Sequence, residues 1–161
     1  MDGAPEWLPE MLNVKQPWPK LLQLLYHVFC DDFIMNAPSF EGMRVNYNDR
    51  ILEQPYPEGF WHLITIDEAG HGRVPDYRRA ERLPWCAPVI SHCEERCILV
   101  WDYLERKEVV RTYIWLDKLD YVVVLQKATA KTWYRVKLIT AFHVDGDSRR
   151  ANLRRKYENR V

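Results

Sequence analysis

A chain of 161 residues, 47% of them hydrophobic, is long enough for one domain with a hydrophobic core. It has no apolar run of the roughly 18 residues that a membrane span requires, and its first residues lack the basic segment of a secretory signal. Its four cysteines fit a reduced protein better than a disulfide framework. These features predict a single domain (residues 1–161) in the cytoplasm, without a membrane segment.

The formal net charge is zero, but the charges are unevenly distributed along the chain. Residues 1–60 hold four Lys or Arg and nine Asp or Glu, whereas residues 131–161 hold nine and three. This asymmetry predicts a surface near the C-terminus that faces a polyanion and a separate acidic surface. A solvated basic helix at the C-terminus is the alternative interpretation.

The N-terminal third is expected to contain one buried helix. Residues 1–16 show no clear pattern and are expected to be a loosely ordered lead-in to a domain of residues 17–158. Residues 20–35 carry apolar side chains at helical spacing, and Pro19 suits the first turn of a helix. Residues 36–59 are interrupted by proline and glycine, so we expect loops there with a short strand at 43–47.

The apolar run of residues 60–66 is predicted to be a strand that carries His62. A histidine among apolar neighbours is usually a hydrogen-bonded core residue. The alternative is a histidine at the edge of a cleft, where a pKa close to neutral suits proton transfer. Sequence alone leaves both interpretations open.

A short arginine-rich helix is predicted over residues 76–83, with Asp76 as its N-cap. Arg78 and Arg82 are four residues apart and share one face of this helix. Helical character resumes at residues 87–96. Four side chains nearby could suggest zinc, but they lack the paired spacing of a structural zinc site, so no metal is expected: Cys86, His92, Cys93 and Cys97.

The second half of the chain is predicted to form strands followed by a basic helix. Strands are predicted at residues 98–104, 109–116, 121–126 and 134–144, with short polar connections that suit antiparallel neighbours. Residues 148–158 are predicted to form a terminal helix rich in arginine. Helices first, then a run of strands, then a short helix is an α+β arrangement.

The segment 133–144 carries most of the candidate chemistry. Strand alternation would place Thr140 on a face with Tyr134, and Lys137 on the opposite face with Arg135. The simplest interpretation is an ordinary strand with a solvated outer face, because strand patterns are weak evidence for sites.

Five short sequence motifs, which follow one another in a fixed order along the chain, favour a functional role for this segment. They are Trp61-His62-Leu63, Arg82-Leu83-Pro84-Trp85, Tyr121-Val122-Val123-Val124-Leu125, Leu138-Ile139-Thr140-Ala141-Phe142 and Arg154-Arg155-Lys156-Tyr157-Glu158. In this order, over residues 20–158, the chain resembles the phage- and toxin-associated branch of the barnase–EndoU–colicin–RelE superfamily of metal-independent ribonucleases. The resemblance implies N-terminal helices packed on a curved antiparallel sheet of about four strands, with a short basic C-terminal helix.

The resemblance also implies RNA cleavage without metal or cofactor, by attack of the ribose 2′-OH to give a 2′,3′-cyclic phosphate. The catalytic candidates that it implies are His62, Arg79, Lys137, Thr140 and Tyr134, although Arg78 or Arg82 could take the place of Arg79. His62 would act as base or acid, the cations would hold the phosphate, and Thr140 or Tyr134 would bond a phosphate oxygen. The expected RNA-binding residues are Arg78, Arg82, Lys127, Lys131, Arg135, Arg149 and Arg150.

The expected partners follow from this activity. RNA would be the substrate, with tRNA as one candidate, and a cognate antitoxin or immunity protein would neutralise the enzyme at the basic residues 131–161. Two other hypotheses stay open. One is a non-catalytic RNA-binding or regulatory module on the same fold. The other is an interaction protein that acts through its acidic N-terminal half.

Overall fold

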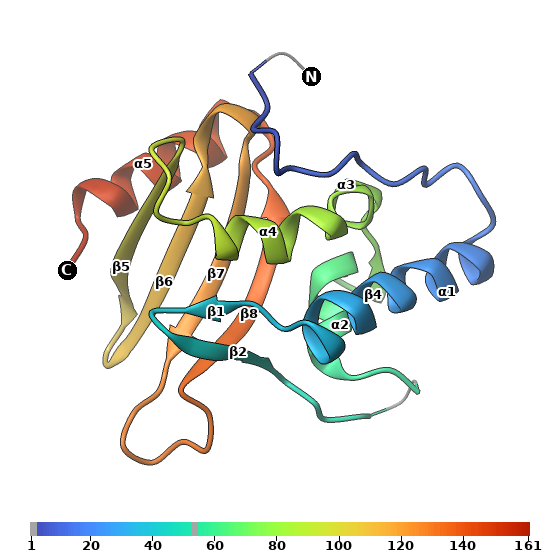
Figure 1. Cartoon of the computed structure of the whole chain (residues 1–161), viewed down its shortest axis with the longest axis horizontal. Coiled ribbons are helices and arrows are strands. Elements are labelled where there is room, and N and C mark those ends of the chain that lie inside the picture. Colours follow the sequence, from blue (N-terminus) through green and yellow to red (C-terminus); the bar gives the residue numbers. More distant parts are fainter. Residues whose placement is uncertain (1–2, 53–54) are drawn as a thin grey trace.

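A twisted, curled sheet organises the molecule (Figure 1). The computed structural model describes residues 3–52 and 55–161, and these form an α+β fold. The six strands of the sheet run in the order β1-β2-β8-β7-β6-β5. The N-terminal helices cover one face and helix α5 (Gly146–Glu158) covers the other (Figure 1).

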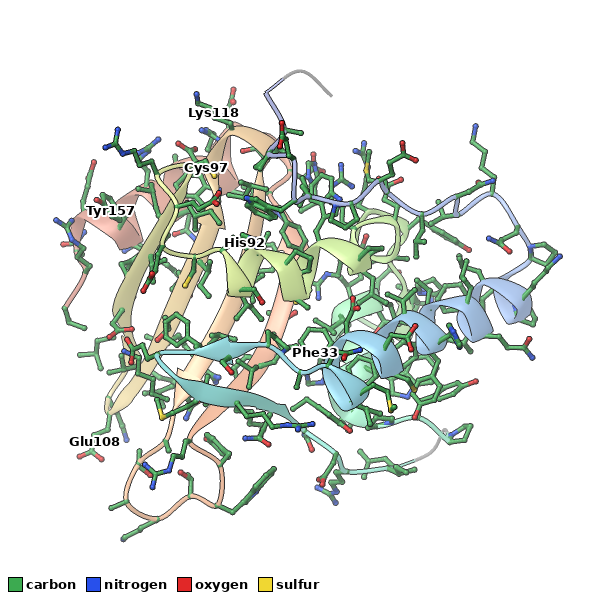
Figure 2. All side chains as sticks on the ribbon, viewed as in Figure 1. Phe33, His92, Cys97, Glu108, Lys118 and Tyr157 are labelled. Carbon is green, nitrogen blue, oxygen red and sulfur yellow. The ribbon has the colours of Figure 1, made fainter. Side chains whose placement is uncertain are left out.

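The predicted buried helix is confirmed. Helix α1 (Trp18–Phe29) buries Leu21, Leu25 and Phe29, which lie four residues apart and therefore on one face. It continues as a π-helical segment, Cys30–Met35, in which Phe33 is buried. Together these two segments supply the N-terminal wall of the larger core, and side chains fill the space between them and the sheet (Figure 2).

The strand predicted at residues 60–66 is wrong, because these residues form helix α2 (Glu58–Ile64). Phe60, Leu63 and Ile64 are buried, and their spacing of three and four residues fits a helix. A run of seven mostly apolar residues fits either period, and Pro57 just before it favours the start of a helix. His62 therefore lies on a helix.

Two short strands and two short helices follow α2. Strands β3 (Thr65–Glu68) and β4 (Gly72–Pro75) pair as a separate antiparallel hairpin. Helix α3 (Tyr77–Glu81) has the predicted cap, since the Asp76 carboxylate accepts hydrogen bonds from the backbone N–H groups of Arg78 and Arg79. A turn of 3-10 helix (Leu83–Trp85) and helix α4 (Cys86–Ser91) then cross the sheet (Figure 1).

The four predicted antiparallel strands are present, but they are only part of the sheet. They are β5 (Ile98–Arg106), β6 (Val109–Leu116), β7 (Tyr121–Lys127) and β8 (Val136–His143). Glu108 marks the turn between β5 and β6, and Lys118 lies in the 3-10 turn (Asp117–Leu119) at the opposite end (Figure 2).

The expectation of an antiparallel sheet of about four strands therefore needs correction. Strand β2 (Met43–Tyr47) pairs in parallel with β8, with Val45 opposite Val136, and β1 (Ser39–Phe40) pairs with β2. A parallel pair needs a long connection, and here most of the domain separates the two strands. Local patterns do not reveal such a distant pairing.

A β-bulge in β8 changes which side chains reach the core. Thr140 pairs with Val124 and Leu138 pairs with Leu125, so Ile139 is an extra residue on β8. Side chains of paired residues point to the same face. Thr140 therefore leaves the core face of Leu138 and joins Val124 on the face of α5. The regular alternation predicted along residues 133–144 is wrong beyond Leu138, and the strand begins only at Val136.

The core has two parts, one on each face of the sheet. The larger lies between the sheet and α1, α2 and α4, and the smaller joins Trp101 and Trp115 to Leu153 of α5. Tyr157 of α5 adds an edge-to-face contact with Trp101, at 5.3 Å between ring centroids. In the part of the chain that the structure describes, no helix has the length and apolar character needed to cross a membrane.

Residues 3–16 contain no helix or strand, yet they are held against the body of the domain. The Trp85 indole donates to the Pro9 carbonyl at 2.8 Å, and the Leu12 N–H donates to the Glu81 carbonyl at 2.8 Å. The Trp7 ring stacks on His92 with ring centroids 4.3 Å apart. A loosely ordered lead-in was expected here; the structure instead shows a segment that contributes apolar contacts to the larger core.

Candidate active site

The C-terminal end of α2 meets α3 beside the free part of β8. Because β2 pairs with β8 only as far as Leu138, the rest of β8 is flanked by α2 and α3. The Thr140 hydroxyl donates to the His62 carbonyl at 3.0 Å. A side chain of the sheet thus fixes the last turn of the helix that carries His62.

Arg79, on α3, connects α3 with α2 and β8 through its hydrogen bonds. Its Nη1 donates to the carbonyls of His62 and Thr65 at 2.9 and 3.3 Å, and to the Thr140 hydroxyl at 3.1 Å. The last carbonyls of a helix have no partner within it, so this guanidinium caps α2. Its Nε lies 3.4 Å from the Asp76 carboxylate. Burial lowers the pKa of Arg79, and Asp76 opposes that shift. Arg79 is therefore a positioning residue in this state.

The His62 imidazole faces partly into solvent, with 33% of its side chain exposed. Its Nε2 lies 3.3 Å from the carboxylate of Glu58, one helical turn earlier. Burial lowers the pKa of His62, nearby Arg73 lowers it further, and Glu58 acts in the opposite direction. An imidazole with a lowered pKa is mostly neutral at pH 7, which suits a group that must accept a proton.

A cavity of about 1050 Å³ opens where these elements meet. Its lining includes five of the predicted site residues, His62, Thr140, Arg78, Arg79 and Arg149, the last of which lies in the first turn of α5. The cavity also contains four carboxylates, Asp67, Asp76, Glu81 and Asp145. Two of the four are already engaged, since Asp76 caps α3 and Glu81 pairs with Arg82.

Sequence reasoning did not single out two cavity residues, Arg73 and His143. Arg73 projects from β4, where its Nη1 donates to the Thr65 hydroxyl at 3.1 Å. The pKa of His143 is lowered by burial and by Arg82 and Arg78. Its Nδ1 is buried and has no hydrogen-bond partner among the described residues. The one available signal was that His143 follows Thr140 on the same strand.

The structure places two predicted catalytic residues outside this cavity. Tyr134 precedes β8 and is buried, and the Lys137 ammonium lies 5.3 Å from the centre of its ring. Lys137 is in the part of β8 that pairs with β2. Three residues of strand span about 10 Å, which separates Lys137 from Thr140 and from the chemistry around His62. A single concave surface holding Lys137 as well as His62 and Thr140 is not formed.

Several predicted RNA-binding residues hold the fold together instead. Arg82 is only 7% exposed, pairs with Glu81 at 2.6 Å and lies over the Trp85 ring. Lys127 pairs with Glu41 at 3.0 Å and with Asp102 at 3.4 Å. Arg150 pairs with the carboxylates of the 3-10 turn and its C-cap, Asp117 and Asp120, and so fastens α5 to the sheet.

The other two predicted RNA-binding residues, Lys131 and Arg135, lie on the exposed loop between β7 and β8. This loop also carries Trp133, with 69% of the residue exposed. It projects beyond the end of the sheet where β2 lies (Figure 1). None of these three residues lines the cavity around His62.

Within residues 3–52 and 55–161, no group of three or more His, Cys, Asp or Glu side chains is placed to hold a metal ion. The cysteines and histidine considered for zinc have other environments. Cys86 is buried, and burial raises the pKa of its thiol. The His92 ring stacks on Trp7, and its Nδ1 lies 2.8 Å from the Pro88 carbonyl.

Comparisons of this chain with protein-family models, with curated proteins and with solved structures found no match. The resemblance to metal-independent ribonucleases thus remains a prediction from the sequence.

Proposed function

We propose that this protein is a metal-independent endoribonuclease. The ribose 2′-OH would attack the adjacent phosphorus, and the bond to the 5′ oxygen would break, leaving a 2′,3′-cyclic phosphate and a 5′-OH. The observation that carries the proposal is the meeting of His62, Arg79 and Thr140, from three separate elements, at one cavity. A second histidine, His143, lines that cavity too.

The two histidines supply the proton transfers that this reaction needs. A base must remove the 2′-OH proton and an acid must protonate the leaving 5′ oxygen. His62 has a carboxylate neighbour, Glu58, that orients its ring and stabilises the imidazolium after proton uptake. We therefore assign His62 as the base and His143 as the acid.

The arginines supply positive charge where the phosphorane develops negative charge. Arg73 and Arg78 are exposed, as is Arg149, so their guanidinium groups are accessible to a phosphate. Guanidinium binds phosphate through two parallel hydrogen bonds, which fixes orientation as well as charge. Thr140 and the Arg79 Nη1 already bond protein oxygens, so they hold His62 in place and leave phosphate binding to the exposed arginines.

The test is cleavage of end-labelled RNA in excess EDTA, with identification of the product ends. Wild-type protein should leave 2′,3′-cyclic phosphate and 5′-OH ends. His62→Ala should cut roughly 10²- to 10⁴-fold more slowly, as is typical for a lost general base. His27→Ala is the matched control, because His27 lies on α1 outside the cavity and its side chain is 76% exposed. Equal rates for both variants, or dependence on added Mg²⁺, would contradict the mechanism.

A non-catalytic RNA-binding module is the second candidate. It is favoured by the hydrogen bonds that already occupy Thr140 and Arg79. It predicts that the wild-type protein binds RNA in a salt-dependent manner and leaves it intact under every condition of the cleavage assay.

A further inference from the structure

The cavity around His62 has a neighbour on the side of α1. This second cavity, of about 740 Å³, shares Thr65, Arg73 and Pro75 with the first, so the two adjoin along β4. Its walls include two indoles, Trp18 and Trp61, both partly exposed. We call it the aromatic cavity.

A third cavity, of about 440 Å³, adjoins the first on the side of α5. The two share Ile139, Thr140 and Arg149. We call it the cationic cavity because Arg111 and Lys156 line it as well.

One cation of the cationic cavity lacks a complete set of partners. The Nη1 of Arg111 is buried and has no hydrogen-bond partner among the described residues. The carboxylate in this lining, Glu105, is bonded to the Lys156 ammonium at 3.0 Å and to the Tyr113 hydroxyl. Glu105 is thereby largely neutralised, and Arg111 retains a donor without an acceptor.

We propose that the three cavities form one groove for an unpaired RNA strand. A base occupies the aromatic cavity, the phosphate to be cut lies beside His62, and a neighbouring phosphate binds in the cationic cavity. This inference rests on the proposed function for the identity of the ligand. It goes beyond that function because it defines the substrate as single-stranded and assigns a base-binding subsite.

The side chains of the two outer cavities decide which of them binds a base and which binds a phosphate. Indole faces stack on any exposed base, and a base is available only where the strand is unpaired. The aromatic cavity also holds the Glu58 carboxylate, which repels a phosphate. The opposite end offers Arg111, whose Nη1 has no hydrogen-bond acceptor among the described residues, and guanidinium binds phosphate through strong charge-assisted hydrogen bonds.

The experiment measures binding of 2′-O-methyl oligonucleotides, which lack the attacking hydroxyl and therefore cannot be cut. Affinity should rise from mononucleotide to trinucleotide and then level off, and a duplex of the same sequence should bind more weakly. Trp18→Leu should weaken trinucleotide binding about 5- to 150-fold, the usual loss for one stacked base. Trp133→Leu should leave it unchanged, because Trp133 lines none of the three cavities.

A second pair of variants avoids the core contacts of Trp18. Leu52 and Ile51 are neighbours with similar exposure, 54% and 59%, but only Leu52 lines the aromatic cavity. Both Leu52→Glu and Ile51→Glu add one negative charge at nearly the same place, so a difference between them reports the contact with the cavity. Leu52→Glu should weaken trinucleotide binding several-fold more than Ile51→Glu. Arg111→Gln should also weaken binding, and Arg106→Gln, outside the three cavities, should not.

The outcomes separate the groove from the catalytic proposal. If RNA is cut in EDTA but affinity is the same for every length and for the Leu52 and Ile51 variants, the proposed RNA-binding groove is wrong and the proposed ribonuclease activity is supported. If binding follows the predicted length and variant pattern but RNA is never cut, the groove is supported and the catalytic proposal fails.

Discussion

At the scale of single residues, the protonation of His62 and His143 links activity to pH. Burial lowers the pKa of both below the ordinary 6.5. One must be neutral and the other charged for the proposed reaction, so kcat/KM should follow a bell-shaped curve with its maximum below pH 6.5. Initial rates between pH 4.5 and 8 check this. A maximum above pH 7 in the free enzyme would contradict the assignment of these two histidines.

The lowered pKa of His62 also makes the stability of the fold depend on pH. A histidine whose pKa is lower in the folded state is protonated more readily in the unfolded state, so stability is lost as pH falls below about 6.5. Asp32 acts in the opposite direction, because burial and Asp31 raise its pKa to about 6. The comparison must therefore be between variants.

We expect His62→Gln to lose less stability than wild type between pH 7.5 and pH 5.5. Urea unfolding at both pH values measures the difference, and Asp32 contributes equally to both proteins. His27→Gln, at an exposed histidine on α1, is the control for the replacement of a histidine by glutamine. An identical slope for His62→Gln would show that the imidazole titrates normally.

Thr140 is the residue whose position depends most on the tertiary structure. Thr140→Val keeps the shape but removes the hydrogen bonds to the His62 carbonyl and to Arg79. The unpaired groups should cost about 1–3 kcal/mol of unfolding free energy. Cleavage should fall mainly through kcat, because His62 would be misplaced while the exposed arginines still bind RNA. Thr140→Ser should restore most of both losses; failure of Ser to rescue would exclude a positioning role for the hydroxyl.

At the scale of elements, helix α3 depends on its cap. Asp76→Ala removes the acceptor for the N–H groups of Arg78 and Arg79 and the carboxylate beside the Arg79 Nε. A lost N-cap costs about 1 kcal/mol. The melting temperature should therefore fall by several degrees, and cleavage should fall with it, since α3 carries two cavity arginines. Asp67→Ala, an exposed cavity residue on β3, should leave the melting temperature nearly unchanged.

At the scale of the whole molecule, the charge gradient suggests a partner. An active ribonuclease would damage its own cell, so we propose a neutralising protein that presents an acidic surface to residues 131–161, where α5 exposes Arg149, Arg154 and Arg155. Purification from the native source should recover the two proteins together at low salt, and 1 M salt should weaken the complex. Recovery of the active protein alone from healthy cells would count against this proposal.

The sequence by itself determined most of the elements. Regular periodicity located α1, α3 with its Asp76 cap, the antiparallel strands β5 to β8 and helix α5, because each depends on side chains within one short segment. It failed at residues 60–66, where a short apolar run suits a helix and a strand equally. It also failed to predict the pairing of β2 with β8, which depends on residues far apart in the chain.

Only the tertiary structure decided the site. The sequence singled out His62, Arg79 and Thr140, but their contacts exist because the Ile139 bulge turns Thr140 out of the core and because β2 leaves the end of β8 free for α2. Lys137 and Tyr134 lie near Thr140 in the chain and still fall outside the cavity. A bulge alters the face of every later residue on its strand, and alternation along a sequence contains no signal for where that shift occurs.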